Sequence, residues 1–224
     1  MSRIISSYLN LDEKIMKNPS NLTAKGLARC EKLLDAAAKV FLHSGFEKAS
    51  LNEIINISGG SLSTIYKVFG NKEGLFKAFL EYKSSKIFED LSKNLEKERD
   101  LEKFLYKIGE KFLSLVVTDE AILFHRLIIA EGYRNDAKLG NMFVKSAAGF
   151  WAQAISERLI EAKKRDEIEV EDPLLASYQF LDAIKGPFLF HLVLGVKVDS
   201  SKEAQERALR QLVKIFMKGF AKTN

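Results

Sequence analysis

The sequence contains only one cysteine, Cys30, among its 224 residues. A single thiol cannot form an intramolecular disulfide, and the residues around it lack the spacing of metal ligands. We therefore expect Cys30 to be a small buried residue. No metal site and no other cofactor is predicted.

Long hydrophobic runs are also missing. The apolar run FLFHLVLGV at 188–196 is much shorter than the roughly 20 residues that a membrane-spanning helix needs. The N-terminus has no continuous hydrophobic signal segment. Hydrophobic residues nevertheless make up 46% of the chain, which is enough to bury a sizeable core. We expect a soluble, cytoplasmic protein that has no membrane partner.

Proline is scarce, with three residues in the whole chain, and strand-like alternation is absent. Apolar residues instead recur every three to four positions over long stretches, which is typical of helices. We therefore predict an all-α fold. The predicted helical segments are residues 24–44, 50–57, 61–68, 72–95, 100–117, 119–133, 136–165, 172–194 and 200–221.

The first of two short helical segments begins with SLNE at residues 50–53. These residues fit a capping box, in which the Ser50 hydroxyl accepts from a backbone amide near Glu53 while Glu53 reaches back. The long segment before it is expected to end at Gly45, because glycine tolerates the left-handed backbone that ends a helix. We expect one face of that long segment to be buried, formed by Cys30, Leu34, Ala37 and Phe41.

The second short segment follows two adjacent glycines, Gly59 and Gly60. Glycine permits positive φ and close approach of the backbone, and Ser61 can cap the helix that begins there. Ile65 and Phe69 would face inward. Two short helices joined by a tight turn form a helix-turn-helix.

A helix-turn-helix can place its second helix in the major groove of DNA. The outer face of this helix would carry side chains able to contact bases and phosphates. They are Leu62, Ser63, Thr64 and Lys67, flanked by Tyr66 and Lys72. The net charge of +5 permits a polyanionic partner without proving one. Spacing alone leaves a purely structural helix-turn-helix equally open.

One segment, residues 29–76, carries a long ordered series of recognisable residues. The series is LLDAA, then Phe41, Gly45, Phe46, Ser50, Gly59, Ser61, Thr64, Ile65, Tyr66, Phe69, Asn71, Lys72, Glu73, Leu75 and Phe76. With this series the segment resembles the N-terminal DNA-binding domain of the TetR family of bacterial transcriptional regulators. Two later segments, HRLIIAEGYRNDAKLGNMF at 125–143 and DPLLASYQFLDAIKG at 172–186, are similar to the AefR-like group of C-terminal domains in that family.

The resemblance implies a transcriptional repressor that binds a palindromic DNA operator as a homodimer and is released by a small-molecule effector. It places a helix-turn-helix DNA-binding domain at residues 23–72 and a regulatory and dimerisation domain at 73–224, after an N-terminal extension at 1–22. The chain departs from the usual family pattern at three positions, which are Gly60, Leu62 and Val68.

Nine residues are predicted to contact DNA from their match to the family motif and their place on the two short helices. They are Ser50, Asn52, Ser61, Leu62, Ser63, Thr64, Tyr66, Lys67 and Lys72. Tyr66 and Lys72 are assigned to phosphate oxygens. The residues assigned to base edges are Asn52, Ser63, Thr64 and Lys67, since asparagine suits adenine and lysine suits guanine.

The C-terminal part is rich in aromatic residues, and helical spacing places most of them in a core. The resemblance also implies a cavity among the middle helices, and an apolar cavity with a few polar groups suits a small ligand. The predicted lining residues are Phe112, Phe124, His125, Phe150, Trp151 and Tyr178. They predict a largely apolar or aromatic effector, with His125 and Tyr178 as hydrogen-bonding groups.

The last two long segments, 172–194 and 200–221, are predicted to form the homodimer interface as a four-helix seam. Pro187 is expected to bend the first of them. The apolar residues expected at the seam are Leu174, Leu181, Ile184 and Phe188 from one segment and Ala208, Leu212, Ile215 and Phe216 from the other.

An enzyme is the first alternative to a DNA-binding regulator. The three histidines, His43, His125 and His191, lie far apart, and neither an HExxH motif nor a glycine-rich phosphate loop occurs. We therefore predict no catalytic residue. The second alternative is a helical adaptor that binds only proteins, and such an adaptor would show no salt-sensitive binding to DNA.

Overall fold

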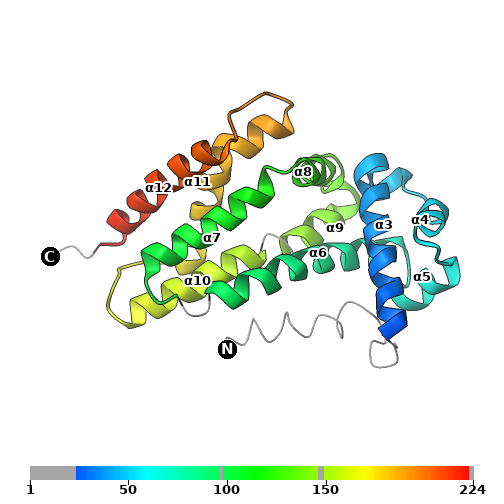
Figure 1. Ribbon diagram of the computed structural model, residues 1–224, viewed down its shortest axis with the longest axis horizontal. Helices are drawn as coiled ribbons and strands as arrows, with labels where there is room; N and C mark the ends of the chain where they lie inside the picture. Colours follow the sequence, from blue (N-terminus) through cyan, green and yellow to red (C-terminus); the bar gives the residue numbers. More distant parts are fainter. Residues whose placement is uncertain (1–23, 96–97, 146–148, 222–224) are drawn as a thin grey trace. The chain divides into compact units, whose positions relative to one another are not determined.

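The computed structural model of the protein describes residues 24–95, 98–145 and 149–221. These residues form ten helices and no strand (Figure 1), which confirms the predicted all-α fold. No helix within them is both long and apolar enough to cross a membrane. The predicted extension at residues 1–22 lies outside the described residues.

The described residues pack as two compact units. The first runs to Asp90 and takes in a later segment that begins at Arg126. The second takes in Leu91–His125 and the described residues from Gly149 onward. The first unit is therefore assembled from two separate stretches of the sequence.

The first unit holds both short helices of the helix-turn-helix. Its complete helices are α3 (Ala24–Lys48), α4 (Leu51–Ser58), α5 (Leu62–Phe69) and α9 (Arg134–Phe143). It also contains most of α6 (Lys72–Leu95) and the second half of α8 (Asp119–Glu131). The predicted segments agree with α3, α4, α5, α6 and α8 to within a few residues.

Helix α3 buries the face that its apolar spacing predicts. Cys30, Leu34, Ala37 and Phe41 are each no more than 4% exposed. The regular helix is interrupted at Gly45, whose φ of 77° and ψ of 168° are not helical, and a further turn then runs to Lys48.

An aromatic cluster fills the core on which α3 packs. The Phe41 and Phe76 rings meet edge to face, with their centroids 5.1 Å apart. Phe46, just after the break in α3, meets the same Phe76 ring at 5.2 Å. Edge-to-face contacts of this kind are favourable beyond the area they bury, so the cluster joins both ends of the break to α6.

The capping box predicted at the start of α4 is wrong. Ser50 is the N-cap residue and has the extended backbone of one, but its hydroxyl makes no capping hydrogen bond. Ser50 and Glu53 are both exposed, so water can satisfy the first backbone amides of the helix in place of the two side chains. Helix α4 begins where the sequence predicts, but the predicted side-chain cap does not form.

The structure assigns two helices to the stretch predicted as a single helix over residues 136–165. Helix α9 ends at Phe143 and α10 (Gly149–Lys164) begins six residues later, and residues 146–148 between them lie outside the described part of the chain. Apolar residues continue at helical spacing across the junction, and no proline marks it. Periodicity therefore does not distinguish α9 from α10.

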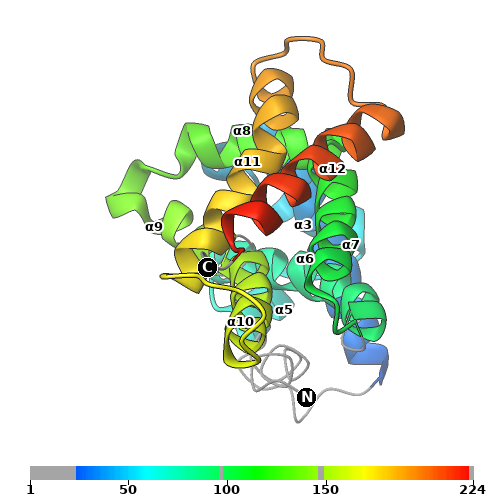
Figure 2. The same cartoon turned by 90° about the vertical axis from the view of Figure 1, so that its left-hand side faces the viewer.

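Four helices of the second unit lie side by side (Figure 2): α7 (Leu101–Val116), α10, α11 (Pro173–Val193) and α12 (Lys202–Gly219). Three of them begin at a side-chain cap, since Asp100, Asp172 and Ser201 each accept a hydrogen bond from a backbone amide of the first turn. Gly109 lets α7 approach α12 closely, because a Cβ there would lie 2.5 Å from Cδ1 of Leu209.

Three residues expected at the dimer seam lie inside the second unit instead. Leu181, Ile184 and Phe188 are at most 4% exposed, because α11 packs against α7, α10 and α12 and turns most of its apolar side chains toward them. Helix α11 continues past Pro187. The large apolar side chains that do remain exposed on α11 and α12 are Leu174, Leu175, Phe190 and Ile215.

Candidate nucleic-acid interface

The turn between α4 and α5 uses its two glycines in different ways. Gly59 has φ 69° and ψ 23°, and its N–H donates to the Ile55 carbonyl at 2.9 Å. A residue with a Cβ is strained in this left-handed conformation. At Gly60 a Cβ would instead lie 3.0 Å from Cδ2 of the fully buried Leu33. The absence of a side chain at Gly60 therefore leaves room for the Leu33 side chain of α3 beside the turn.

Ser61 caps α5, as the sequence predicts. Its hydroxyl accepts from the Thr64 N–H at 3.2 Å, and the two hydroxyl oxygens of Ser61 and Thr64 are 2.9 Å apart. Ile65 and Phe69 are the buried residues of the helix, which confirms the predicted inward face. The cap and these two anchors hold α5 on the unit and leave its opposite face to solvent.

Three of the predicted contact residues, Ser63, Tyr66 and Lys67, are exposed on α5. Their spacing of three and four positions places them on one face of the helix. Tyr66 is 55% exposed although it is aromatic. Leu62 and Thr64 are half-buried. The outer face of α5 thus presents a hydroxyl, a phenol and an ammonium group together.

Two further predicted residues, Ser50 and Asn52, are exposed at the start of α4. The Ser50 hydroxyl is not used as a helix cap. The asparagine amide can both donate and accept hydrogen bonds, which is the pairing that an adenine edge offers.

Lys72, the ninth predicted residue, has a structural role that spacing did not show. Its ammonium donates to the carbonyl oxygens of Glu47 at 2.9 Å and Ala49 at 3.2 Å, and it lies 4.9 Å from the centre of the Phe46 ring. These bonds tie the first residue of α6 to the link between α3 and α4. An ammonium group has three N–H donors, so one remains for a phosphate.

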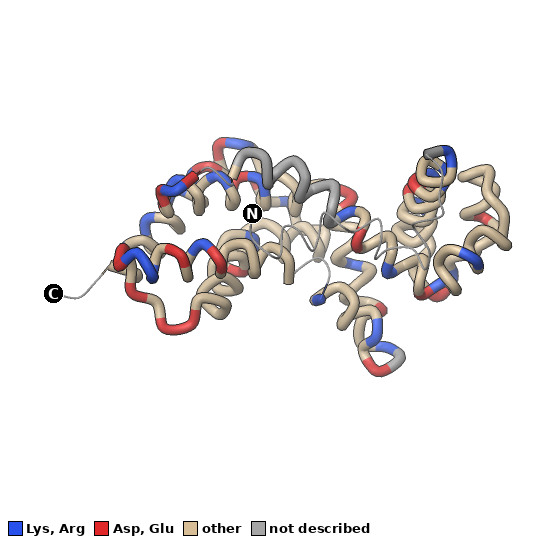
Figure 3. The backbone as a smooth tube through the Cα atoms, turned by 90° about the horizontal axis from the view of Figure 1, so that it is seen from below, with Lys and Arg blue, Asp and Glu red and all other residues tan. Residues whose placement is uncertain are grey.

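Positive charge near the helix-turn-helix comes from a few residues. Figure 3 shows basic and acidic residues interspersed along the described helices. Glu53 is the one charged residue in α4, and Lys67 is the one in α5. Lys48 and Lys72 are two further basic residues close by in sequence.

Three of the six predicted effector residues are brought together in the second unit. The Phe112 and Trp151 ring centroids are 5.1 Å apart, and those of Phe150 and Trp151 are 5.9 Å apart. All three side chains are buried. Their close contact shows that they serve as core, and the assignment of these rings to a ligand stays a prediction.

His125 and Phe124 are neighbours on α8, with ring centroids 6.0 Å apart, and Tyr178 is half-buried on α11. Nδ1 of His125 lies 2.7 Å from the Ala121 carbonyl oxygen, so Nδ1 carries the hydrogen and donates. Burial lowers the pKa of His125, and the charge of Lys185 lowers it further. His125 is therefore neutral at pH 7, which suits contact with an uncharged ligand.

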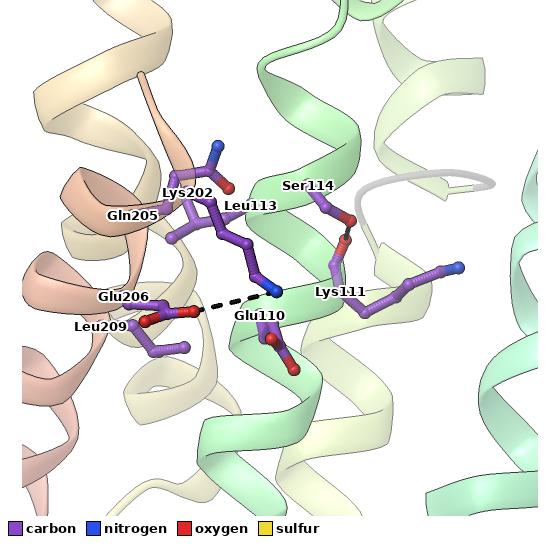
Figure 4. Close-up of a pocket in the computed structure, with 8 residues that line it drawn as sticks. All are labelled: Glu110, Lys111, Leu113, Ser114, Lys202, Gln205, Glu206 and Leu209. Atoms are coloured by element: carbon purple, nitrogen blue, oxygen red, sulfur yellow. Dashed lines mark hydrogen bonds and ion pairs between the residues drawn. The ribbon is translucent and has the colours of Figure 1, made fainter. Parts of the chain in front are cut away.

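A surface hollow of about 470 Å³ lies between α7 and α12 (Figure 4). Four of its eight lining residues are charged, namely Glu110, Lys111, Lys202 and Glu206. None of the six predicted effector residues lines it. Its open, charged walls differ from the apolar enclosure that a small apolar ligand needs.

Comparison with known protein families decides the class of protein. Residues 103–222 match the C-terminal domain model of the AefR-like transcriptional repressors, and residues 33–79 match the model of bacterial regulatory proteins of the tetR family. The chain belongs to the TetR family. This TetR-family chain is a DNA-binding transcriptional regulator, and its helix-turn-helix and helical C-terminal part have the fold of the family.

Relatives of known sequence cover most of this TetR-family chain. It is 27% identical to the transcriptional regulator YvkB of Bacillus subtilis over 195 residues, which are 85% of this chain and 96% of YvkB. It is 23% identical to the nicotine-responsive transcriptional repressor HdnoR of Paenarthrobacter nicotinovorans over 139 residues, 62% of this chain and 71% of HdnoR.

Solved structures share the fold over a similar span. A TetR-family regulator from Mesorhizobium loti has a TM-score of 0.76 at 22% identity and covers 90% of this chain and 100% of its own. FadR of Bacillus subtilis, in complex with stearoyl-CoA, has a TM-score of 0.68 at 18% identity, covering 85% of this chain and 99% of its own.

Proposed function

We propose that this TetR-family regulator is a repressor that binds a palindromic operator as a homodimer and leaves it when a small, largely apolar or aromatic molecule binds. The observation that carries the DNA contact is α5, whose outer face exposes Ser63, Tyr66 and Lys67 while its inner face is buried. A helix held in this way can enter the major groove. A cytoplasmic location, where the protein meets DNA, is part of the proposal.

The predicted DNA contacts divide into two roles. Tyr66 and Lys72 anchor the protein on phosphate oxygens, which carry no sequence information. Base edges are read by Asn52, Ser63 and Lys67, which reach the groove from α4 and α5. The rest of the predicted set is Ser50, Ser61, Leu62 and Thr64. A hydroxyl that already serves in the cap of α5 can still exchange one more hydrogen bond with DNA, and Leu62 suits a thymine methyl group.

Homodimerisation is supported by apolar side chains left exposed on α11 and α12. Leu174, Leu175, Phe190 and Ile215 are each at least 41% exposed, and such residues are normally covered in an obligate interface. Two-fold symmetry of the protein calls for a palindromic operator, with half-sites separated by one helical turn of about 34 Å or a multiple of it.

The class of effector is supported by the residues of the second unit and by the relatives. Phe112, Phe150 and Trp151 form an aromatic cluster, and the neutral His125 adds one polar group. HdnoR is described as nicotine-responsive. The regulator FrrA, with a TM-score of 0.68 and 26% identity, is described as flavonoid-responsive. Both descriptions name ring compounds, which fits an aromatic or apolar effector.

Release from DNA is proposed to pass through α6, which begins at Lys72 and continues into the second unit. A helix is a stiff element, so a shift at one end reaches the other. Effector and operator must then change each other's affinity by the same factor, commonly 5- to 150-fold or about 1–3 kcal/mol.

The experiment that tests this proposal starts from selection on a randomised DNA library with the full chain, followed by fluorescence anisotropy at several salt concentrations. We expect a palindromic sequence and an affinity that falls steeply with salt. Absence of DNA binding even at low salt would favour the adaptor that binds only proteins. Nicotine, a flavonoid and stearoyl-CoA are then titrated as probes. A probe that binds by calorimetry yet leaves operator affinity unchanged contradicts the release mechanism.

A further inference from the structure

The break in α3 leaves backbone donors without their usual acceptors. Gly45 has a positive φ of 77° and a ψ of 168°, so the residues just after it begin a new helical turn, closed by the hydrogen bond from Ala49 N–H to the Gly45 carbonyl. The first amides of such a turn have no carbonyl oxygen one turn earlier to bond with. Phe46 and Glu47 are the residues that carry these amides.

Glu131, the last residue of α8, supplies the missing acceptors. Its Oε1 accepts from the Phe46 N–H at 2.9 Å, and its Oε2 accepts from the Glu47 N–H at 3.1 Å. A carboxylate bonded to two amides at the start of a helical turn is also favoured by the direction of the peptide dipoles. Gly45 makes room for this contact, since a Cβ there would overlap Oε1 of Glu131.

The same short stretch is held from its other side by Lys72. Glu47 donates its N–H to Glu131 and accepts at its carbonyl from the Lys72 ammonium, and Ala49 accepts a second bond from Lys72. An anion on the amides and a cation on the carbonyls therefore fix the chain immediately before Ser50. The carboxylate belongs to α8 and the ammonium to α6, and neither helix is part of the helix-turn-helix.

We infer that Glu131 is a positioning residue for operator binding, acting through the backbone of Phe46 and Glu47. The inference rests on the proposed function. The stretch that Glu131 holds leads directly into α4, where Ser50 and Asn52 are placed to contact DNA. Without the carboxylate, the link has more conformations available, and ordering them on DNA costs binding free energy.

The direction in which DNA affinity changes when Glu131 is removed distinguishes the positioning role from a simple effect of charge. Removing a carboxylate makes the chain more positive, so electrostatic attraction alone predicts slightly tighter binding to DNA. The positioning role predicts weaker binding. Because no phosphate contact is lost, the dependence of log affinity on log salt concentration keeps its slope.

The experiment compares the full chain with Glu131→Ala, Glu131→Gln and the control Glu31→Ala. Glu31 is an exposed carboxylate on α3, so its loss changes the net charge equally. Affinity for the selected operator is measured by anisotropy at several salt concentrations. Hydrogen exchange at residues 44–50 reports on the backbone directly, and circular dichroism checks that each variant folds.

We expect Glu131→Ala to bind the operator about tenfold more weakly than the unchanged chain, as two charge-assisted hydrogen bonds are lost. Its salt slope should be unchanged, and exchange at Phe46 and Glu47 should be faster. Glu131→Gln keeps one acceptor oxygen, so its operator affinity should lie between those of the unchanged chain and Glu131→Ala. This variant preserves the test if the alanine variant does not fold.

Two outcomes overturn the inference. If both Glu131 variants bind as tightly as the unchanged chain or more tightly, Glu131 has no positioning role, although the proposed function stands. If the unchanged chain binds no DNA at all, the proposed function fails and this inference fails with it.

Discussion

Lys72 and Glu47 are joined by a hydrogen bond of 2.9 Å from the lysine ammonium to the backbone carbonyl oxygen. The bond connects the start of α6 to the end of α3, 25 residues earlier. A residue assigned to a DNA phosphate thus also orders the chain that leads into α4. Removing the Lys72 side chain should therefore have two effects. It should lower the salt dependence of DNA binding, through the lost phosphate contact, and it should loosen the link before α4, through the lost bonds to the carbonyls.

For Lys72→Ala we expect the lost phosphate contact to weaken binding to operator and to unrelated DNA by nearly the same factor, because a phosphate contact carries no sequence information. The salt slope should fall by about 1, since one counterion fewer is released. Anisotropy over a salt series measures both. Lys39→Ala, which removes an exposed lysine of α3, is the matched control. An unchanged slope would show that Lys72 acts only through the carbonyls of Glu47 and Ala49.

Substitutions of the proposed base-reading residues should change which DNA is chosen. We expect Asn52→Ala and Lys67→Ala to alter the sequence recovered from a randomised library, with each lost base contact costing roughly 1–3 kcal/mol of discrimination. Tyr66→Phe removes one hydrogen bond and no charge, so it should weaken binding slightly and leave the recovered sequence the same. The division of roles is reversed if Tyr66→Phe shifts the sequence and the other two do not.

Gly59→Ala tests the left-handed turn of the helix-turn-helix. Space is no obstacle, because apart from the adjoining residues no atom in the described part of the chain lies within 4 Å of where the new Cβ would be. The φ of 69° should nevertheless cost about 1 kcal/mol in the free energy of unfolding. Gly219→Ala in α12 is the control, since it has equal space without a positive φ. Thermal or urea unfolding measures both, and equal stability of the two variants would contradict the strain.

His125 should make stability depend on pH. Burial lowers the pKa of its imidazole in the folded chain, so the unfolded chain binds a proton more readily. The stabilising contribution is present above the unfolded pKa of about 6.5 and is lost as the pH falls through the lower folded pKa. Urea unfolding between pH 7.5 and pH 5 should show this loss. His125→Gln should reduce this dependence of stability on pH. The control His191→Gln, at an exposed histidine, should leave it unchanged.

Charged substitutions on α11 and α12 test the homodimer. Phe190 is 66% exposed and Ile215 is 56% exposed, so Phe190→Glu and Ile215→Glu should leave the fold of the subunit unchanged but shift it to a monomer in light scattering. A buried unpaired carboxylate is the cause of the expected loss. Val144→Glu, at a residue of the first unit that is 51% exposed, should stay dimeric. A monomeric unchanged chain at micromolar concentration contradicts the dimer itself.

Several local features could be predicted from the sequence, although the capping box at Ser50 does not form. The cap of Ser61 on Thr64 spans three residues, and Gly59 and Gly60 mark their own turn, so their roles follow from neighbouring residues. The buried face of α3 follows from helical spacing. The end of α9 and the start of α10 did not follow, because the apolar spacing continues from one helix to the other and neither boundary holds a proline.

Contacts between distant residues could not be predicted in this way. Glu131 lies 85 residues from Phe46, and Lys72 lies 25 residues from Glu47, so no spacing relates them. The same limit applied to the seam residues Leu181 and Ile184. Apolar spacing predicts that this face of α11 is buried. Only the packing of α11 on three other helices shows that it is buried within the same subunit and not against a partner.

The discontinuity of the first unit limits how this regulator can be recombined with others. A hybrid sensor made by joining residues 24–72 to a foreign effector domain would leave behind Glu131, and with it the acceptors for the Phe46 and Glu47 amides. A graft extended to the end of α6 would also separate Glu73 from Lys138, its ion-pair partner on α9. A graft that keeps the DNA-reading module intact must therefore carry the segment from Arg126 through α9 as well, or supply a carboxylate at the position of Glu131.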